Sequence, residues 1–566
     1  MQKFSELQYK RPDVKALTKL LKNALKGVKK ASSYEELRKL YLDVSEAMLE
    51  PQTMGSIAHI RNSLDMNDKF YEEEVRYLNT ALAKQGLLGQ KLNKALLASP
   101  FRKQMEEEFG SLFMHDMEVS LKLMNPKIIP MMIQEHKLTQ QYSKDAATAS
   151  CDFRGEKCNF YGLLKHMSVT DREERKEAFE AWAKLYESIS DKLDATYDKL
   201  VALRVKKAKA LGFDNFIDYV YLARQRYDYN AADAARFRDQ VRDEIVPLCN
   251  KLFKEQAERL GVDKLHFYDE DLVFPDGNAN PKGTKDELVQ KALEMYKAMS
   301  PETGEFFSFM VENELFDLET RPGKHMGGYC TFLPLYKAPF IFSNFNGTPA
   351  DVDVLTHEAG HAFEAYICSR TQPLLDFVWS TSEINEIHSM SMEHFAYPYI
   401  GGFVGEENAD KYRYGHLVGA VTCIPYLVAV DEFQHRVFEN PTMTAKERRA
   451  VWHKIEDIYL PWRDYDGNEF LSEGGFWMQK QHIFLYPFYY IDYALAGVCA
   501  FQFYAKERKD HKTAWADYLR LCKAGGSKGY FELLKLANLD NPFEPGTVGK
   551  VVESVKEALA ELGSKL

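Results

Sequence analysis

Apolar residues recur at helical spacing over most of the chain. Near the start they fall at Leu17, Leu21, Ala24 and Val28, with lysines around them, and this spacing predicts an amphipathic helix. The aromatic anchors that are typical of helices lying on a membrane are missing, so we interpret it as a surface helix packed on a core. Residues 172–210 are dense in Glu, Lys and Ala and nearly free of Gly and Pro, which favours one or two long helices. The pattern therefore predicts a mainly α-helical protein.

One segment departs from helical periodicity towards β structure. Residues 321–348 are rich in aromatic, β-branched and glycine residues. We predict two short strands here, Gly328–Pro334 and Phe340–Phe345, joined through a turn. Helix resumes at about Asp351. The two strands are almost the only ones expected, and they would form a small antiparallel sheet beside the next helix.

Length and composition describe an ordinary globular protein with more than one part. The 566 residues exceed what a single hydrophobic core usually serves, and we predict an N-terminal helical subdomain over 1–200 and a larger domain over 201–566. The hydrophobic fraction is 45% and the charged fraction 28%, both common in soluble proteins. The net charge of −11 argues against nucleic acid as a partner along the whole surface.

The chain shows no pattern that predicts secretion or membrane insertion. The first residues lack the apolar run of a secretory signal. The longest nearly apolar run, His416–Val430, is too short to span a bilayer and contains Pro425, so a buried core helix is the better interpretation. Of eight cysteines, only Cys151 and Cys158 lie close together, and their spacing fits neither CxxC nor a zinc ribbon. We therefore expect a cytosolic protein with reduced thiols and no membrane partner.

A metal-binding pattern lies in the helix that follows the predicted strands. His357, Glu358 and His361 form an HExxH motif. Residues four apart project from one face of a helix, so both imidazoles can hold one zinc ion. Glu358 would then reach the metal-activated water as general base, and later return the proton to the leaving amine. The alternative is a surface helix with two solvated histidines.

The residues around the motif argue against that alternative. The helix is apolar almost all round, which implies burial, and buried histidines need partners. The apolar positions are Val352, Leu355, Ala359, Ala362, Phe363 and Tyr366. The metzincin pattern is absent, because Glu364 stands where its Gly would be.

A catalytic zinc site needs a third protein ligand and an open position. The candidate segment, SEINEIHSMSMEHF, offers Glu383, Glu386, His388, Glu393 and His394. Glu386 and Glu393 lie seven residues apart and share one helical face, whereas His388 lies on another. One of the two glutamates would bind zinc and the other would brace a ligating histidine. Spacing prefers this face without deciding between them.

These residues resemble a known family. HEAGHAFEAY followed by SEINEIHSMSMEHF is similar to the thimet oligopeptidase and oligoendopeptidase F family of zinc peptidases. The likeness extends to FDLETRPGKHMGGYCTFLP, to QKQHIFLYPFYYIDYALAG and to CKAGGSKGYFELLKLANLDNPFEP, the last of which favours the oligoendopeptidase F branch. The resemblance implies that Glu386 is the third ligand, and Glu393 then becomes the bracing residue.

The resemblance also implies residues that act on the substrate. Tyr493 and His482 would stabilise the oxyanion that forms on the peptide carbonyl, with Tyr490 and Tyr486 near the substrate. The alternative is that these tyrosines form an ordinary aromatic core. Gly327 and Gly328 would let an extended peptide approach the strands closely, and a simple turn is the alternative for this pair of glycines.

The expected fold and activity follow. The family implies an elongated helical fold enclosing a deep channel that admits unstructured oligopeptides. We expect a zinc-dependent endopeptidase with one zinc ion per chain, acting as a monomer or homo-oligomer; cobalt or manganese would suit the same ligands. Two other hypotheses are a carboxypeptidase-type exopeptidase and a peptide-binding protein with a vestigial site. Free amino acids as sole product would favour the first, and binding without cleavage would favour the second.

Overall fold

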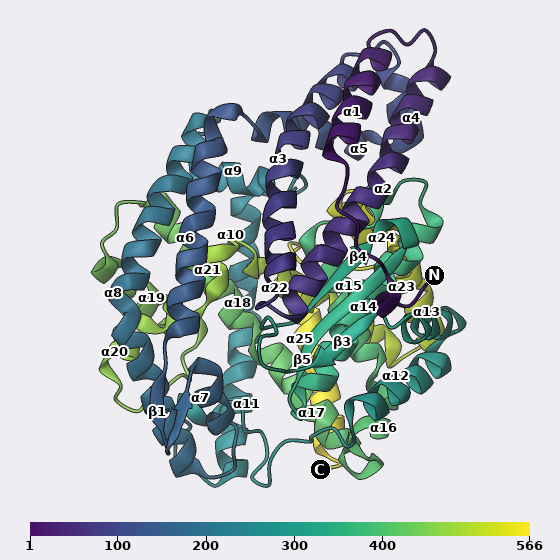
Figure 1. Cartoon of the computed structure of the whole chain (residues 1–566). Coiled ribbons are helices and arrows are strands. Elements are labelled where there is room, and N and C mark those ends of the chain that lie inside the picture. The colour runs from purple at the N-terminus through teal and green to yellow at the C-terminus, as the bar shows by residue number, and fades with distance from the viewer. The chain divides into compact units, whose positions relative to one another are not determined.

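The computed structural model describes residues 1–566, except for the side chains of residues 82–84. Helices make up most of it (Figure 1), which confirms the predicted mainly α-helical fold. The chain divides into two compact units, each assembled from three stretches of sequence. The first comprises Met1–Leu123, Asn280–Ala409 and Lys506–Leu539, and the second comprises Met124–Ala279, Asp410–Ala505 and Asp540–Leu566.

The first unit contains a helical N-terminal part and a small sheet with its covering helices. Its helices are α1 (Val14–Val28), α2 (Tyr34–Leu64), α3 (Lys69–Leu97), α4 (Arg102–Phe109), α5 (Ser111–Leu123), α12 (Lys285–Met299), α13 (Pro301–Glu312), α14 (Ala350–Thr371), α15 (Ser382–Phe395), α16 (Gly401–Val404), α23 (His511–Ala524) and α24 (Tyr530–Leu536). Its strands are β3 (Phe316–Glu319), β4 (Tyr329–Leu333) and β5 (Ala338–Phe345).

The second unit is almost entirely helical apart from one hairpin. Its strands are β1 (Cys151–Phe153) and β2 (Glu156–Cys158), and its helices are α6 (Ile129–Thr148), α7 (Phe160–Met167), α8 (Arg172–Ala210), α9 (Phe216–Ala223), α10 (Ala231–Gln240), α11 (Val246–Leu260), α17 (Ala409–Thr422), α18 (Ile424–Glu439), α19 (Ala445–Tyr459), α20 (Glu469–Ser472), α21 (Gln481–Leu485), α22 (Tyr490–Glu507) and α25 (Thr547–Gly563). The dense stretch over 172–210 is the single helix α8. The predicted boundary after residue 200 falls inside α8. The two compact units divide the chain at other points.

The N-terminal helix α1 packs on the core as its pattern predicts. Asp13 caps it by accepting hydrogen bonds from the backbone N–H groups of residues 15 and 16. Its apolar face, including Leu21 and Val28, is buried against α2 and α3. The stripe between the lysines therefore serves packing in this unit.

The sheet of the first unit has the strand order β3-β5-β4. β4 and β5 pair antiparallel, with Tyr329 opposite Phe342 and Leu333 opposite Ala338, which confirms the predicted strand pair. β3 adds a parallel neighbour to β5, so the sheet is mixed and not purely antiparallel. Sequence periodicity missed β3 because it is four residues long and half charged.

Helix α14 lies directly against this sheet (Figure 1) and contacts β5, β4, α15 and α23. It is buried on nearly every side, as its apolar flanks predict. Ala365 of α14 packs with Phe332 of β4 and with Val378 in the turn before α15. Sheet and helices together fix the position of the HExxH segment.

One stretch, Glu406–Glu439, passes a length and hydropathy test for crossing a membrane. It contains a short 3-10 helix, Glu406–Asn408, followed by α17 and α18, which meet at Cys423. The structure buries 67% of its most apolar window, and core helices of soluble proteins pass the same test. All eight cysteines in the described chain are free thiols.

Candidate metal centre

Helix α14 presents the two motif histidines on one face. His357 and His361 are one helical turn apart, and their ring centroids lie 5.1 Å from each other. Both side chains are largely buried, with exposed fractions of 23% and 14%. Two imidazoles are thus held side by side in a partly enclosed space.

Helix α15 brings Glu386 to the same point. Its Oε2 atom lies 3.3 Å from His357 Nε2 and 3.5 Å from His361 Nε2. One donor atom from each of the three residues lies within 4.8 Å of the other two. The structure therefore assembles the three residues expected as metal ligands into one group that can hold an ion.

Glu393 lies behind the first histidine. Its Oε1 atom is 2.6 Å from His357 Nδ1, so this contact directs His357 Nε2 towards Glu386. A carboxylate in this position fixes the tautomer and orientation of a ligating imidazole. The two glutamates that spacing could not separate thus occupy different places, one on each ring nitrogen of His357.

The charged side chains of the metal centre shift one another's pKa values. Burial alone would lower the pKa of His357, but hydrogen bonds to Glu386 and Glu393 raise it well above its usual value. Burial works to raise the pKa of Glu386, yet its contacts with His357 and His361 hold it well below the usual range. Glu386 is therefore an anionic donor, as a cation site requires.

Two small residues that sequence analysis missed let α14 and α15 bring the three donor residues together. Ser389 Oγ donates a hydrogen bond to Glu386 Oε2 at 3.1 Å, which orients the carboxylate. Gly360, between the motif histidines, lets α15 approach closely. A methyl group there would lie 2.6 Å from Ser389 Cα and 2.7 Å from the carbonyl oxygen of His388.

Gly360→Ala is expected to disturb the centre without changing a donor. The added methyl group meets backbone, which cannot rotate away, so α15 must shift at a cost of roughly 1–3 kcal/mol of unfolding free energy. Zinc affinity should fall as well, because Glu386 moves with α15. Thermal unfolding and zinc competition measure the two effects.

Gly55→Ala in α2 is the matched control for that substitution. A methyl group at Gly55 would meet no atom within 4 Å, so this helix should be unchanged or stabilised by up to ~1 kcal/mol. Equal behaviour of the two variants would contradict the close packing at Gly360.

A second polar pair joins the same helices away from the donors. His388 Nδ1 lies 3.1 Å from Glu364 Oε2, and both side chains are fully buried. His388, one of the five candidates in the downstream segment, thus lies on another face of α15, as spacing predicts. Sequence analysis treated Glu364 only as the residue that breaks the metzincin pattern.

Glu358 is buried beside the centre and binds neither histidine. Burial is the main cause that raises its pKa above the usual value. Its Oε2 atom is enclosed and has no hydrogen-bond partner in the described part of the chain. A methyl group at Gly328 would lie 3.5 Å from Glu358 Oε1, so the start of β4 runs close to this carboxyl. Gly327 has a φ of 86°, which favours glycine.

The late histidine and tyrosines form one aromatic cluster in the second unit. The His482 ring lies 4.7 Å from Tyr490, 5.8 Å from Tyr486 and 6.4 Å from Tyr493, centroid to centroid. Tyr490 is buried, whereas Tyr486 is 55% exposed. The residues of the metal centre belong to the first unit.

Family models match both parts of the sequence. Residues 4–124 match the Peptidase M3 N-terminal domain, and residues 165–549, well over half of the chain, match Peptidase family M3. The chain belongs to peptidase family M3. This confirms the family that the HExxH segment and the downstream glutamate segment indicated. The relatives of this M3 chain place it in the oligoendopeptidase F branch.

Three relatives show the extent of the likeness. Oligopeptidase PepF of Bacillus subtilis is 24% identical over 71% of the M3 chain and 59% of its own length. Oligoendopeptidase F of Lactococcus lactis subsp. cremoris is 25% identical over 67% of the chain and 62% of its own length. The match thus spans about three fifths of these curated relatives. A solved structure, PZ peptidase A with an inhibitor, has 44% identity, a TM-score of 0.94 and 99% coverage of both chains.

Proposed function

We propose that this M3 chain is a zinc-dependent endopeptidase that cleaves internal bonds of short, unstructured oligopeptides. The observation that carries the proposal is the convergence of His357, His361 and Glu386 within 4.8 Å. Two imidazoles and one carboxylate are a donor set typical of catalytic zinc, which keeps one position open. The enclosed Oε2 atom of Glu358, which has no partner in the described chain, fits a site that holds a further polar group.

The residues around the centre divide the chemistry. Zinc, when bound, supplies a Lewis acid that makes water acidic near neutral pH and polarises the peptide carbonyl. Glu358 would take a proton from that water and later deliver it to the leaving nitrogen. Its raised pKa suits a group that must hold this proton between the two steps. Glu393 would keep His357 oriented throughout.

Residues outside the donor set would contact the substrate. The tyrosine and histidine of the aromatic cluster, Tyr493 and His482, would donate hydrogen bonds to the developing oxyanion, and Tyr490 and Tyr486 would contact the peptide. β4 is an edge strand, and the glycines before it, Gly327 and Gly328, would let an extended peptide pair along it. Paired in this way, a peptide must be unfolded to be cleaved, which restricts the substrate class.

Tyr493→Phe should retain zinc and lower turnover by ~100-fold, the effect of removing one oxyanion donor. Steady-state kinetics with a defined peptide, together with metal analysis, measures both quantities. Tyr504→Phe, on the same helix α22, is the matched control and should keep its turnover. Wild-type turnover in Tyr493→Phe would indicate that a neighbouring phenol is the donor. Tyr490→Phe and Tyr486→Phe are then the next variants.

Mass spectrometry of quenched peptide digests tests the reaction itself. Peptides blocked at both ends should be cut internally, cutting should stop with a chelator, and it should return with zinc. Release of free amino acids only, and only from unblocked peptides, would indicate an exopeptidase. Zinc-loaded protein that binds peptides and cuts none would indicate a vestigial site.

We also propose that the enzyme works in the cytosol. The eight free cysteines in the described chain are typical of a reducing compartment. Fractionation of cells that express the protein, followed by immunodetection, tests this location. Recovery outside the cytosolic fraction would contradict it.

A further inference from the structure

A second group of metal-binding side chains lies in the second unit, on the β1–β2 hairpin and the helix after it. The hairpin turns at Arg154 and Gly155, both with positive φ, as a tight two-residue turn requires. Asn159 then caps α7 by accepting a hydrogen bond from the N–H of Gly162. A methyl group at Gly162 would lie 3.4 Å from Cys158 Sγ, so the first turn of α7 lies over this thiol.

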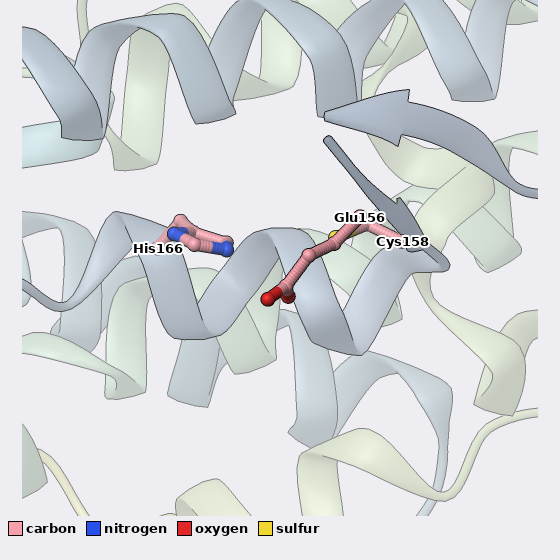
Figure 2. A group of neighbouring side chains, drawn as sticks. All are labelled: Glu156, Cys158 and His166. Carbon is pink, nitrogen blue, oxygen red and sulfur yellow. The ribbon is translucent and has the colours of Figure 1, made fainter. Parts of the chain in front are cut away.

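Three different donor types meet here. Glu156 and Cys158 are two residues apart on β2 and point to the same side of the strand, and His166 comes from the last turn of α7 (Figure 2). One donor atom of each lies within 4.8 Å of the other two. Cys158 is buried, His166 is partly buried and Glu156 is exposed, so an ion could enter from the carboxylate side.

A carboxylate holds one ring nitrogen of His166. Its Nδ1 atom lies 2.7 Å from Glu174 Oε1 on α8, and Arg154 donates a hydrogen bond to the other oxygen of Glu174 at 2.8 Å. This arrangement leaves Nε2 of His166 for a ligand. A carboxylate behind one ring nitrogen is the usual support of a ligating histidine, and it matches the role of Glu393 behind His357.

We propose that Cys158, His166 and Glu156 form a second metal site, distinct from the catalytic centre, that takes zinc or a similar thiolate-binding divalent cation. Thiolate, imidazole and carboxylate together suit zinc, while magnesium and calcium prefer oxygen donors alone. An ion there would join β2 to α7 and stabilise this corner of the unit. Cys151 is the cross-strand partner of Cys158, but it lies outside this group of three donors.

Cobalt(II) is the probe that separates this site from the catalytic one. Only the hairpin site has a thiolate donor, so cobalt bound there should give a sulfur-to-metal charge-transfer band in the near ultraviolet. The experiment adds cobalt to metal-free full-length enzyme, with a phosphine reductant that keeps Cys151 and Cys158 reduced. The band is expected in the wild type and in Glu386→Ala, which should lose cleavage but keep the band. Loss of cleavage and loss of the band are therefore independent results.

Variants assign the band to its donors. Cys158→Ser should abolish it, and His166→Gln and Glu156→Gln should each weaken cobalt binding at least ~10-fold. Glu174→Gln should weaken it ~10- to 100-fold, as for other groups behind a ligand. His136→Gln, an exposed histidine on α6, is the control and should change nothing. Circular dichroism verifies that each variant is folded. Because Glu156 is exposed, Glu156→Gln tests the site without disturbing the core.

Three results would overturn the second site. The first is the absence of a charge-transfer band in the cobalt-loaded wild type. The second is a band that persists in Cys158→Ser, since the thiolate donor then lies elsewhere. The third is a band that is lost in Cys158→Ser but unaffected by both His166→Gln and Glu156→Gln, since this means adventitious binding to a lone thiol.

Discussion

Glu358→Gln is expected to lower peptide turnover by ~10²- to 10⁴-fold, the range for loss of a general acid–base group, while the zinc content stays at the wild-type level. The amide has the same shape as the carboxyl but cannot accept the proton from water. Glu358 makes no contact with Glu386 or with either histidine ring nitrogen in the described ion pairs, so the donor set should remain intact. Single-turnover kinetics and elemental analysis of the same sample measure both properties.

The control for this substitution is Glu312→Gln. Glu312 is an exposed residue on α13 in the same unit, and its variant should keep wild-type kinetics. Wild-type turnover in Glu358→Gln would refute its role as base. Lost zinc together with lost turnover would instead show that Glu358 supports the donors.

Glu386→Ala should weaken zinc binding by more than ~100-fold, or more than ~2.7 kcal/mol, because it removes one of three donors and the only anionic one. His357 also loses one of its two carboxylate contacts. Glu393→Gln should have the smaller effect of ~10- to 100-fold, since it only orients an imidazole. Competition with a chromophoric chelator measures both affinities.

The order of these two effects decides which glutamate is the ligand. A larger loss in Glu393→Gln than in Glu386→Ala would reverse the assignment. Ser389→Ala offers a graded check, because it keeps every donor and removes only the hydroxyl that holds Glu386 Oε2. It should fall between the wild type and Glu386→Ala in zinc affinity.

Local pattern was enough to predict most of the fold and part of the centre. Helices α1, α8 and α14 follow from apolar spacing, and the β4–β5 pair follows from aromatic and β-branched runs. His357 and His361 follow from the period of a helix, since residues four apart share a face. These features depend on neighbours in sequence, which is why a single sequence reveals them.

Features that depend on packing between distant segments were not predictable in the same way. Glu386 and Glu393 share a helical face, so only the position of α15 against α14 separates them. The closeness of Gly360 to Ser389 and the pairing of Glu364 with His388 arise from the same contact. β3 escaped detection because its partner β5 stabilises it from outside its own four residues.

The proposed second metal site, formed by Glu156, Cys158 and His166, was also not predictable from the sequence. Cys151 and Cys158 matched no metal motif by spacing, and His166 stands eight residues further on. The turn at Gly155 and the start of α7 bring Cys158 and His166 together. Motif spacing records only the arrangements that recur, whereas this one depends on a particular turn and helix cap.

Zinc titration of the metal-depleted enzyme, while internal cleavage of a doubly blocked peptide is followed, tests the proposed centre most directly. Activity should be absent in chelator, should rise with free zinc to a plateau in the wild type, and should stay near zero in Glu386→Ala at the same zinc concentrations. Full cleavage in the presence of chelator, or equal zinc dependence in wild type and Glu386→Ala, would contradict a zinc peptidase centred on His357, His361 and Glu386.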